Sequence, residues 1–237
     1  MGNLRVFFYK QKRKFERYAI LKRISQNMID DSKNITDYDK LIEFTRNYPD
    51  FQPAQKFSEI KKIMELASAP NVHTLCEVGT YKGGALFLLA QAAANDSLLI
   101  SVDIEYTDYR DWIYQKFAKP GQRIKCIKGN THDLSTILKM KRALNGRKID
   151  LLFIDGDHSF FGVMNDYIRF LPFVSEGGVI VFHDIQPDSK MRYGIKTESD
   201  VGGVPIFWEA IKKSGENTGE YIENKDQDGY GLGFIYR

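Results

Sequence analysis

The sequence contains little cysteine and no long apolar run. Only two of its 237 residues are cysteines, Cys76 and Cys126. Both fall inside expected core strands, so we expect buried, unpaired thiols and a reducing, cytoplasmic setting. No segment approaches the ~18 unbroken apolar residues of a membrane span, and the first residues lack the apolar core and cleavage site of a secretory signal. The two cysteines and four histidines show no spacing typical of structural zinc.

The net charge is small, but it is unevenly distributed. The whole chain carries +3, from 34 basic and 31 acidic residues. Residues 1–24 contain eight of the basic residues and one acid, so this arm carries +7 and the remainder −4. Aromatic and aliphatic side chains are interspersed with these charges, which indicates a partly amphipathic helix. Such an arm is suited to contact an anionic surface, such as lipid or nucleic acid, and equally suited to pack on its own domain or in a homodimer.

Strand and helix patterns alternate from residue 72 onward. The expected strands cover 72–79, 98–104, 124–129, 149–155 and 178–184, with two short strands near 219–224 and 231–236. The expected helices cover 57–67, 83–94, 108–118, 133–144, 160–173 and 204–213. This alternation predicts an α/β fold, a doubly wound, Rossmann-like, mostly parallel sheet with helices on both faces. The last two strands predict an antiparallel C-terminal hairpin at the sheet edge.

A glycine-containing turn follows the first expected strand. It runs Glu77-Val-Gly-Thr-Tyr-Lys-Gly83 and leads directly into a helix. Gly79 allows a sharp turn and a close approach to a ligand, and Gly83 allows the helix N-terminus, with its free N–H groups, to approach as well. Asp103, at the end of the next strand, is placed to accept hydrogen bonds from two ribose hydroxyls. This pattern predicts a cofactor that contains a nucleoside.

Ionisable side chains follow the two expected central strands. The strand ends deliver Asp155-Gly-Asp157-His158 and His183-Asp184. Ligands bind at the carboxyl ends of strands in an open parallel sheet, and carboxylates crowded there raise each other's pKa unless a cation or hydrogen bonds intervene. We therefore assign these residues a functional role. For His73 and His132 the residue pattern alone favours a surface or loop role.

The region from about Phe51 onward resembles the class I S-adenosylmethionine-dependent methyltransferases. Within them it resembles the O-methyltransferase branch that contains catechol-type, macrolide and sugar O-methyltransferases and cephalosporin-hydroxylase-like proteins. The shared features are the Glu77–Gly83 turn, Asp103, the stretch 154–159, and Gly177-Gly178 before a strand that ends in His183-Asp184. The aromatic Tyr81, at a position often occupied by glycine, is typical of the metal-dependent branch. The resemblance divides the chain into a basic helical extension, residues 1–35, and a methyltransferase domain, residues 36–237.

The resemblance implies a site for S-adenosylmethionine. Gly79 and Gly83 would line the methionine moiety, with Glu77 fixing their loop, while Asp103 would hold the ribose. The remaining implied cofactor residues are Tyr81 in the turn, Ile104 packed on the adenine, Thr131 and His132 at the adenine edge, and Asp155 beside the pocket.

The resemblance also implies a divalent metal. Asp155 and Asp184 match metal-ligand positions, and His183 falls where the third ligand is usually a carboxylate or amide. Because imidazole suits a transition ion better than Mg²⁺, the identity of the metal stays open. His158 lies where catechol-type enzymes have their general base, and Asp155 and His158 are the expected catalytic residues. The long polar loop 186–203 is expected to close over the acceptor, with Arg192 and Tyr193 facing it.

The expected function is methyl transfer from S-adenosylmethionine to a hydroxyl of a sugar or another small hydroxylated acceptor. A nicotinamide or nucleotide-sugar oxidoreductase is the first alternative, although the chain has no Gly-x-Gly-x-x-Gly and Tyr81 occupies the position of the middle glycine. A non-catalytic cofactor-binding module, whose arm contacts a polyanion, is the second. Binding of S-adenosylhomocysteine separates the first alternative from the expected function, and metal-dependent turnover separates the second.

Overall fold

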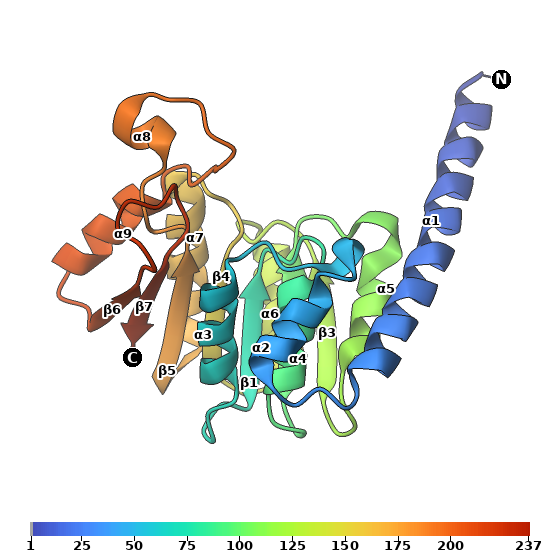
Figure 1. The fold of residues 1–237 in the computed structure, drawn as a ribbon, viewed down its shortest axis with the longest axis horizontal. Helices are drawn as coiled ribbons and strands as arrows, with labels where there is room; N and C mark the ends of the chain where they lie inside the picture. Colours follow the sequence, from blue (N-terminus) through green and yellow to red (C-terminus); the bar gives the residue numbers. More distant parts are fainter. Residues whose placement is uncertain (1) are drawn as a thin grey trace.

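A single seven-stranded sheet organises the molecule (Figure 1). The computed structural model describes residues 2–237, with the side chains of residue 9 and of residues 11–237. The strand order is β3-β2-β1-β4-β5-β7-β6. The strands are β1 (Thr74–Val78), β2 (Leu98–Asp103), β3 (Arg123–Lys128), β4 (Ile149–Ile154), β5 (Val174–His183), β6 (Thr218–Tyr221) and β7 (Leu232–Tyr236). The first five are parallel and β7 is antiparallel to both β5 and β6, so the predicted topology and C-terminal hairpin are confirmed.

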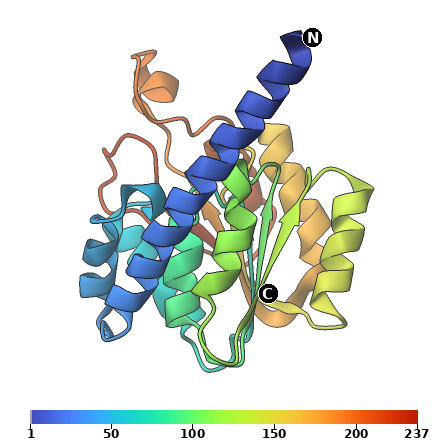
Figure 2. The ribbon, with the colours of Figure 1, turned by 90° about the vertical axis from the view of Figure 1, so that its right-hand side faces the viewer.

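Helices cover both faces of the sheet (Figures 1 and 2). One face carries α2 (Tyr38–Thr45), α3 (Phe57–Ala67), α4 (Gly84–Ala92), α5 (Arg110–Tyr114) and the end of α1 (Gly2–Ser32). The other carries α6 (Leu134–Leu144), α7 (Phe160–Phe170) and α9 (Val204–Lys213). Side chains of β4 alternate between the two cores, with Leu151 and Phe153 on the first and Leu152 and Ile154 on the second. This alternation explains why β4 reads as an unbroken apolar run.

Several element boundaries differ from the prediction. The helix expected at 108–118 is a short α5 between two 3₁₀ turns, Thr107–Tyr109 and Gln115–Phe117, because Asp108 and Tyr109 have left-handed backbones with φ 53° and 57°. Helix α7 ends at Phe170, before a 3₁₀ turn that contains Pro172. Strand β5 begins at Val174, where it pairs with Ile149, and a register shift lets it continue through Gly177 and Gly178. Helices α2 and α8 (Ser189–Tyr193) were not predicted.

Helix α1 joins the basic arm to the sheet. Its later residues Leu21 and Met28 are fully buried in the first core. Further towards the N-terminus, Tyr18 packs on Tyr109 and Trp112, with ring centroids 6.1 and 5.6 Å away. The first turns extend beyond the rest of the molecule (Figure 2), and the side chains of Arg5, Phe7, Phe8 and Lys10 lie outside the described residues. Among the described residues, no helix has the length and apolar character needed to cross a membrane.

Candidate active site

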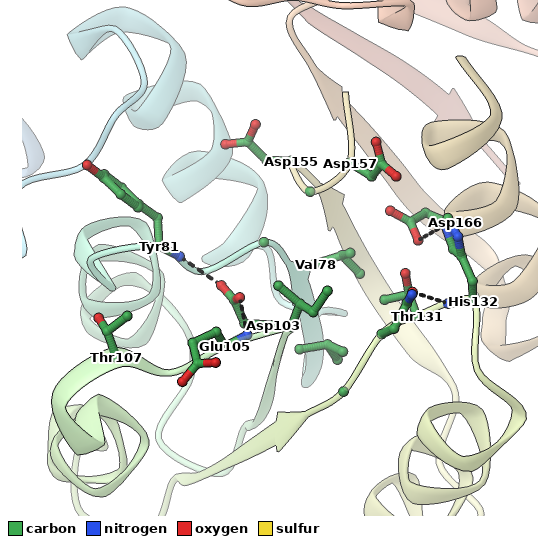
Figure 3. Close-up of a pocket in the computed structure, with 16 residues that line it drawn as sticks. Val78, Tyr81, Asp103, Glu105, Thr107, Thr131, His132, Asp155, Asp157 and Asp166 are labelled. Carbon is green, nitrogen blue, oxygen red and sulfur yellow. Dashed lines mark hydrogen bonds and ion pairs between the residues drawn. The ribbon is translucent and has the colours of Figure 1, made fainter. Parts of the chain in front are cut away.

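A cavity of about 520 Å³ opens at the carboxyl ends of β1 to β4 (Figure 3). It lies where the strand order reverses, between β1 and β4, which is the usual ligand position in a doubly wound sheet. Its lining includes seven of the nine residues expected to bind a cofactor: Gly79, Tyr81, Asp103, Ile104, Thr131, His132 and Asp155. The structure therefore brings together residues from four strand ends in the arrangement that a nucleoside cofactor requires.

The other two expected cofactor residues, Glu77 and Gly83, lie behind this lining. Gly83 begins α4 with φ +81°, and a Cβ atom there would lie 2.4 Å from the ring of Tyr114. Gly79 itself has φ +85°, and a Cβ atom there would lie 1.9 Å from the carbonyl oxygen of Asp155. These positions admit only glycine, because the turn is pressed against the loop after β4 and against α5.

Asp103 connects the ribose side of the cavity to the glycine turn. Its Oδ2 accepts hydrogen bonds from the backbone N–H groups of Thr80 at 2.8 Å and Tyr81 at 3.0 Å. Its Oδ1 accepts from the N–H of Glu105 at 3.0 Å. A carboxylate offers about four lone-pair positions, so one on Oδ1 remains for a ligand hydroxyl. The turn and the ligand thus share one anionic side chain.

Glu77 is buried beneath the turn, with 2% of its surface exposed. Its Oε2 has no hydrogen-bond partner, and burial raises the pKa of this carboxyl to about 8. An unpaired buried carboxyl oxygen is unusual and indicates that a partner is supplied by something other than this chain. The cationic amino group of a methionine moiety is the kind of partner that fits.

A second cluster lies at the ends of β4 and β5. The Nε2 atom of His158 lies 3.5 Å from Oδ1 of Asp155 and 3.6 Å from Oδ2 of Asp184. The Nδ1 atom of His183 lies 3.2 and 3.3 Å from the same two oxygens. Two imidazoles therefore flank one pair of carboxylate oxygens. The ligand atoms of Asp155, His158 and Asp184 lie within 4.8 Å of one another, a geometry suitable for a metal ion.

Backbone strain supports a functional role for this cluster. Asp184 has φ +61°, a left-handed conformation that is uncommon outside glycine. The N–H of Tyr230 donates a hydrogen bond to its Oδ1 at 3.2 Å. Strained residues of this kind concentrate at functional sites, where the surrounding structure holds them in place. In this conformation Oδ2 of Asp184 lies within 3.6 Å of both imidazoles.

The carboxylates and imidazoles of this cluster shift one another's pKa values. The hydrogen bond with Asp155 raises the pKa of His158 to about 9. Burial would lower the pKa of His183, but Asp155 and Asp184 raise it well above its ordinary value. Burial would likewise raise the pKa of Asp155, yet His183 and His158 hold it well below its usual range. The carboxylates therefore favour the protonated forms of both imidazoles, and His158 could bind a cation only after its Nε2 proton is lost.

Glu59 completes the buried side of the cluster. This α3 residue is fully buried, and its Oε2 lies 3.1 Å from Nε2 of His183. Its Oε1 accepts a hydrogen bond from the N–H of Gly231 at 2.6 Å. His183 thus lies between Glu59 on one side and Asp155 and Asp184 on the other, which fixes the orientation of its ring.

The loop 186–203 contacts the same cluster. The Nδ1 atom of His158 is hydrogen-bonded to the carbonyl oxygen of Asp200, and the N–H of Gly203 donates to the carbonyl oxygen of His158. Arg192 donates to the carbonyl oxygen of Lys225 at 3.2 Å, whereas Tyr193 is exposed. The loop is therefore anchored at His158 and at the segment before β7.

Two buried acids at this site were missed by the sequence interpretation, Glu59 and Asp166. Both occupy inward positions of amphipathic helices: Glu59 precedes the buried Ile60, and Asp166 lies between the buried Val163 and Phe170. A charged residue within an apolar helical stripe is the signal that would have identified them.

Comparison with known proteins agrees with this geometry. Residues 76–185 match the sequence profile of a family described as a methyltransferase domain. An uncharacterised protein of Acanthamoeba polyphaga mimivirus, R132, is 30% identical over 161 residues, which cover 64% of this chain and 72% of that protein.

Solved structures share the fold at lower identity. An O-methyltransferase from Bacillus cereus, in complex with S-adenosylhomocysteine, is 14% identical with a TM-score of 0.57, covering 87% of this chain and 94% of that one. TomG from Streptomyces achromogenes, an O-methyltransferase involved in tomaymycin synthesis and bound to S-adenosylmethionine, is 17% identical with a TM-score of 0.56, covering 91% and 98%.

Proposed function

We propose that the chain, whose residues 76–185 match a methyltransferase domain, is an S-adenosylmethionine-dependent O-methyltransferase that methylates a hydroxyl of a sugar or another small hydroxylated acceptor, assisted by a divalent cation. The observation that carries the proposal is the position of the Asp155–His158–Asp184 cluster, whose Asp155 also lines the cofactor cavity. A metal at that position and a cofactor in the cavity would both be adjacent to one acceptor. The match to a methyltransferase domain gives no support to the oxidoreductase alternative.

The cavity fits the cofactor through its own polar groups. Asp103 retains a lone pair for a ribose hydroxyl, and Glu77 has an unpaired oxygen beneath the turn. Ile104 has 67% of its surface exposed at the cavity, so it offers an apolar face to the adenine. When bound, the sulfonium cofactor supplies an electrophilic methyl group. The role of the residues beside the cavity would be to hold the acceptor oxygen in line with the methyl group, and such alignment can contribute several kcal/mol to rate acceleration.

We assign the cation to the carboxylate oxygens of Asp155 and Asp184. Nε2 of His158 lies 3.5 and 3.6 Å from these oxygens, and the ligand atoms of Asp155, His158 and Asp184 all lie within 4.8 Å of one another. These three residues would hold the cation, while the buried His183, whose Nδ1 lies 3.2 and 3.3 Å from the same two oxygens, would keep the carboxylates in place. An imidazole beside two carboxylates suits a transition ion better than Mg²⁺.

The tautomer of His158 supports a ligand role for this side chain. Its Nδ1 donates to the Asp200 carbonyl oxygen and so keeps its proton, and Nε2, which faces the carboxylates, is the nitrogen whose proton a cation would replace. A role as general base requires the same atom to be free. We therefore propose that His158 would bind the cation, which would lower the pKa of an acceptor hydroxyl, and the hydroxyl proton would pass to water as the methyl group is transferred.

The test measures metal content and methyl transfer on the same protein. Chelator treatment should abolish transfer to a panel of vicinal diols and sugars, while S-adenosylhomocysteine binding stays nearly unchanged. Readdition of Mn²⁺, Co²⁺ or Zn²⁺ should restore transfer.

A pair of variants connects the cation to the named ligands. Asp184→Asn should lose most of the bound cation, whereas Asp157→Asn should retain it, because Asp157 is exposed and its Oδ1 accepts from the N–H of Ser159 at 2.9 Å. Full activity in chelator would contradict the cation proposal. Absence of transfer to any hydroxylated acceptor, with S-adenosylhomocysteine bound, would favour the non-catalytic alternative.

A further inference from the structure

Asp166 on α7 is a buried acid that faces the cofactor cavity. It is 1% exposed and it lines the cavity, yet neither of its carboxylate oxygens has a hydrogen-bond partner. Its Oδ1 lies 3.8 Å from Nε2 of His132, a buried nitrogen that also has no hydrogen-bond partner. Figure 3 shows Asp166 and His132 next to each other, across the cavity from Tyr81. Two adjacent polar groups are thus available to a ligand.

The environment of Asp166 does not satisfy its charge. Burial raises the pKa of this carboxyl to about 6. The Thr131 hydroxyl, the His132 ring and the backbone N–H of Asp157 lie nearby and act in the opposite direction, but none of them forms a hydrogen bond of normal geometry with the carboxyl. Leaving a buried carboxyl without donors is costly, and unpaired groups of this kind are rare in native proteins unless a ligand completes them.

We propose that Asp166 and His132 recognise the amino edge of the cofactor's adenine, which makes Asp166 a specificity-determining residue. This inference rests on the cofactor assignment of the proposed function. Asp103 holds the ribose at the end of β2, and Ile104, next in the chain, packs on the base. We therefore expect the base edge to point past the end of β3, where His132 lies, towards Asp166 on α7.

The chemistry of the pair matches adenine and opposes hypoxanthine. Adenine presents an exocyclic amino donor beside a ring-nitrogen acceptor. A carboxylate accepts from the amino group, and an imidazole N–H donates to the ring nitrogen. Hypoxanthine carries a carbonyl oxygen in place of the amino group, so it would face the carboxylate with an acceptor. A purely structural Asp166 would give no such preference, because its contacts would not involve the base.

The experiment compares two ligands by calorimetry, S-adenosylhomocysteine and its deaminated analogue S-inosylhomocysteine. The wild-type protein should bind the adenine form roughly 10- to 100-fold more tightly. Asp166→Asn should reduce this ratio to below about 3-fold, because the carboxamide can rotate and donate its N–H to the carbonyl oxygen. Glu105→Gln removes a charge at another part of the same cavity, where Glu105 is exposed and paired with Lys128, and should leave the ratio unchanged.

The outcomes separate this inference from the proposed function. A wild-type ratio near one, or an unchanged ratio in a folded Asp166→Asn protein, overturns the role of Asp166 while the cofactor assignment stands. Failure of the wild-type protein to bind S-adenosylhomocysteine overturns the cofactor assignment and this inference with it. Should Asp166→Asn fail to fold, the wild-type ratio alone decides.

Discussion

Replacing Asp103 by asparagine tests the ribose assignment with a magnitude that follows from the geometry. Three of the ~4 lone-pair positions of this carboxylate are used by the N–H groups of Thr80, Tyr81 and Glu105. One position on Oδ1 remains, so we expect a single direct hydrogen bond to a ribose hydroxyl. A hydrogen bond to a charged group contributes about 1.5–3 kcal/mol. Asp103→Asn should therefore weaken S-adenosylhomocysteine binding roughly 10- to 150-fold.

Calorimetry with modified ligands identifies the hydroxyl. If Oδ1 binds one ribose hydroxyl, the effect of Asp103→Asn should largely disappear for the analogue that lacks this hydroxyl and persist for the other deoxy analogue. Glu105→Gln is the matched control, because Glu105 also lines the cavity but is exposed and paired with Lys128 at 3.1 Å. Its effect should stay below about 3-fold, since exposed ion pairs contribute little. Wild-type affinity in a folded Asp103→Asn protein would refute the assignment.

Three further predictions concern the buried acids, the histidines and the arm. Burial raises the pKa of Glu77 from 4.5 to about 8 in the folded protein, so the folded state holds a proton on this carboxyl that the unfolded state loses, and the free energy of unfolding should fall as pH rises from ~4.5 to ~8. Glu77→Gln should remove this pH dependence and, in urea unfolding at pH 8, be more stable than the wild-type protein by about a few kcal/mol. His183→Ala should lower the free energy of unfolding by about 3–5 kcal/mol, because it leaves the fully buried Glu59 without its imidazole partner. His158 is partly exposed, so His158→Ala should mainly reduce the amount of bound metal. Equal destabilisation by the two variants would contradict a structural role for His183 and a ligand role for His158. Replacing the exposed Lys12, Arg13 and Lys14 by glutamine should weaken binding to anionic vesicles, and added salt should weaken binding of the wild-type protein in the same way. Vesicle binding that changes with neither the substitutions nor the salt would favour a packing role for the arm, and sedimentation of the variant should then show a changed oligomeric state.

The fold could be predicted because its signals are local. Apolar strand runs, intervening helical periods and the turn at Gly79 each depend on a few neighbouring residues, and together they imply a parallel sheet with its ligands at the strand ends. The missed helix α2 follows the N-cap Asp37, directly after the expected boundary at residue 35, and has only eight residues. The missed α8 has five residues and begins at the N-cap Asp188, too short for a periodic pattern.

The arrangement within the site could not be predicted from the sequence. Asp155, His158, His183 and Asp184 were identified, but their contacts depend on the tertiary approach of β4 to β5 and on the left-handed backbone of Asp184. Glu59 lies 124 positions from His183 in the sequence, so no local pattern connects them. Asp166 reaches the cavity from a helix rather than from a strand end, whereas the general rule for this fold directs attention to the strand ends.

The place of β7 between β5 and β6 makes the site a product of late synthesis. Until β7 is made, β5 has a free edge beside the catalytic strand ends, and the N–H groups of Tyr230 and Gly231 are not available to Asp184 and Glu59. A nascent chain that ends before residue 230 thus carries every ionisable side chain of the cluster but not the backbone donors that orient two of them. The cluster is therefore completed only after residue 231 has been made, so shorter chains have an exposed edge of β5 and lack the two backbone donors that orient Asp184 and Glu59.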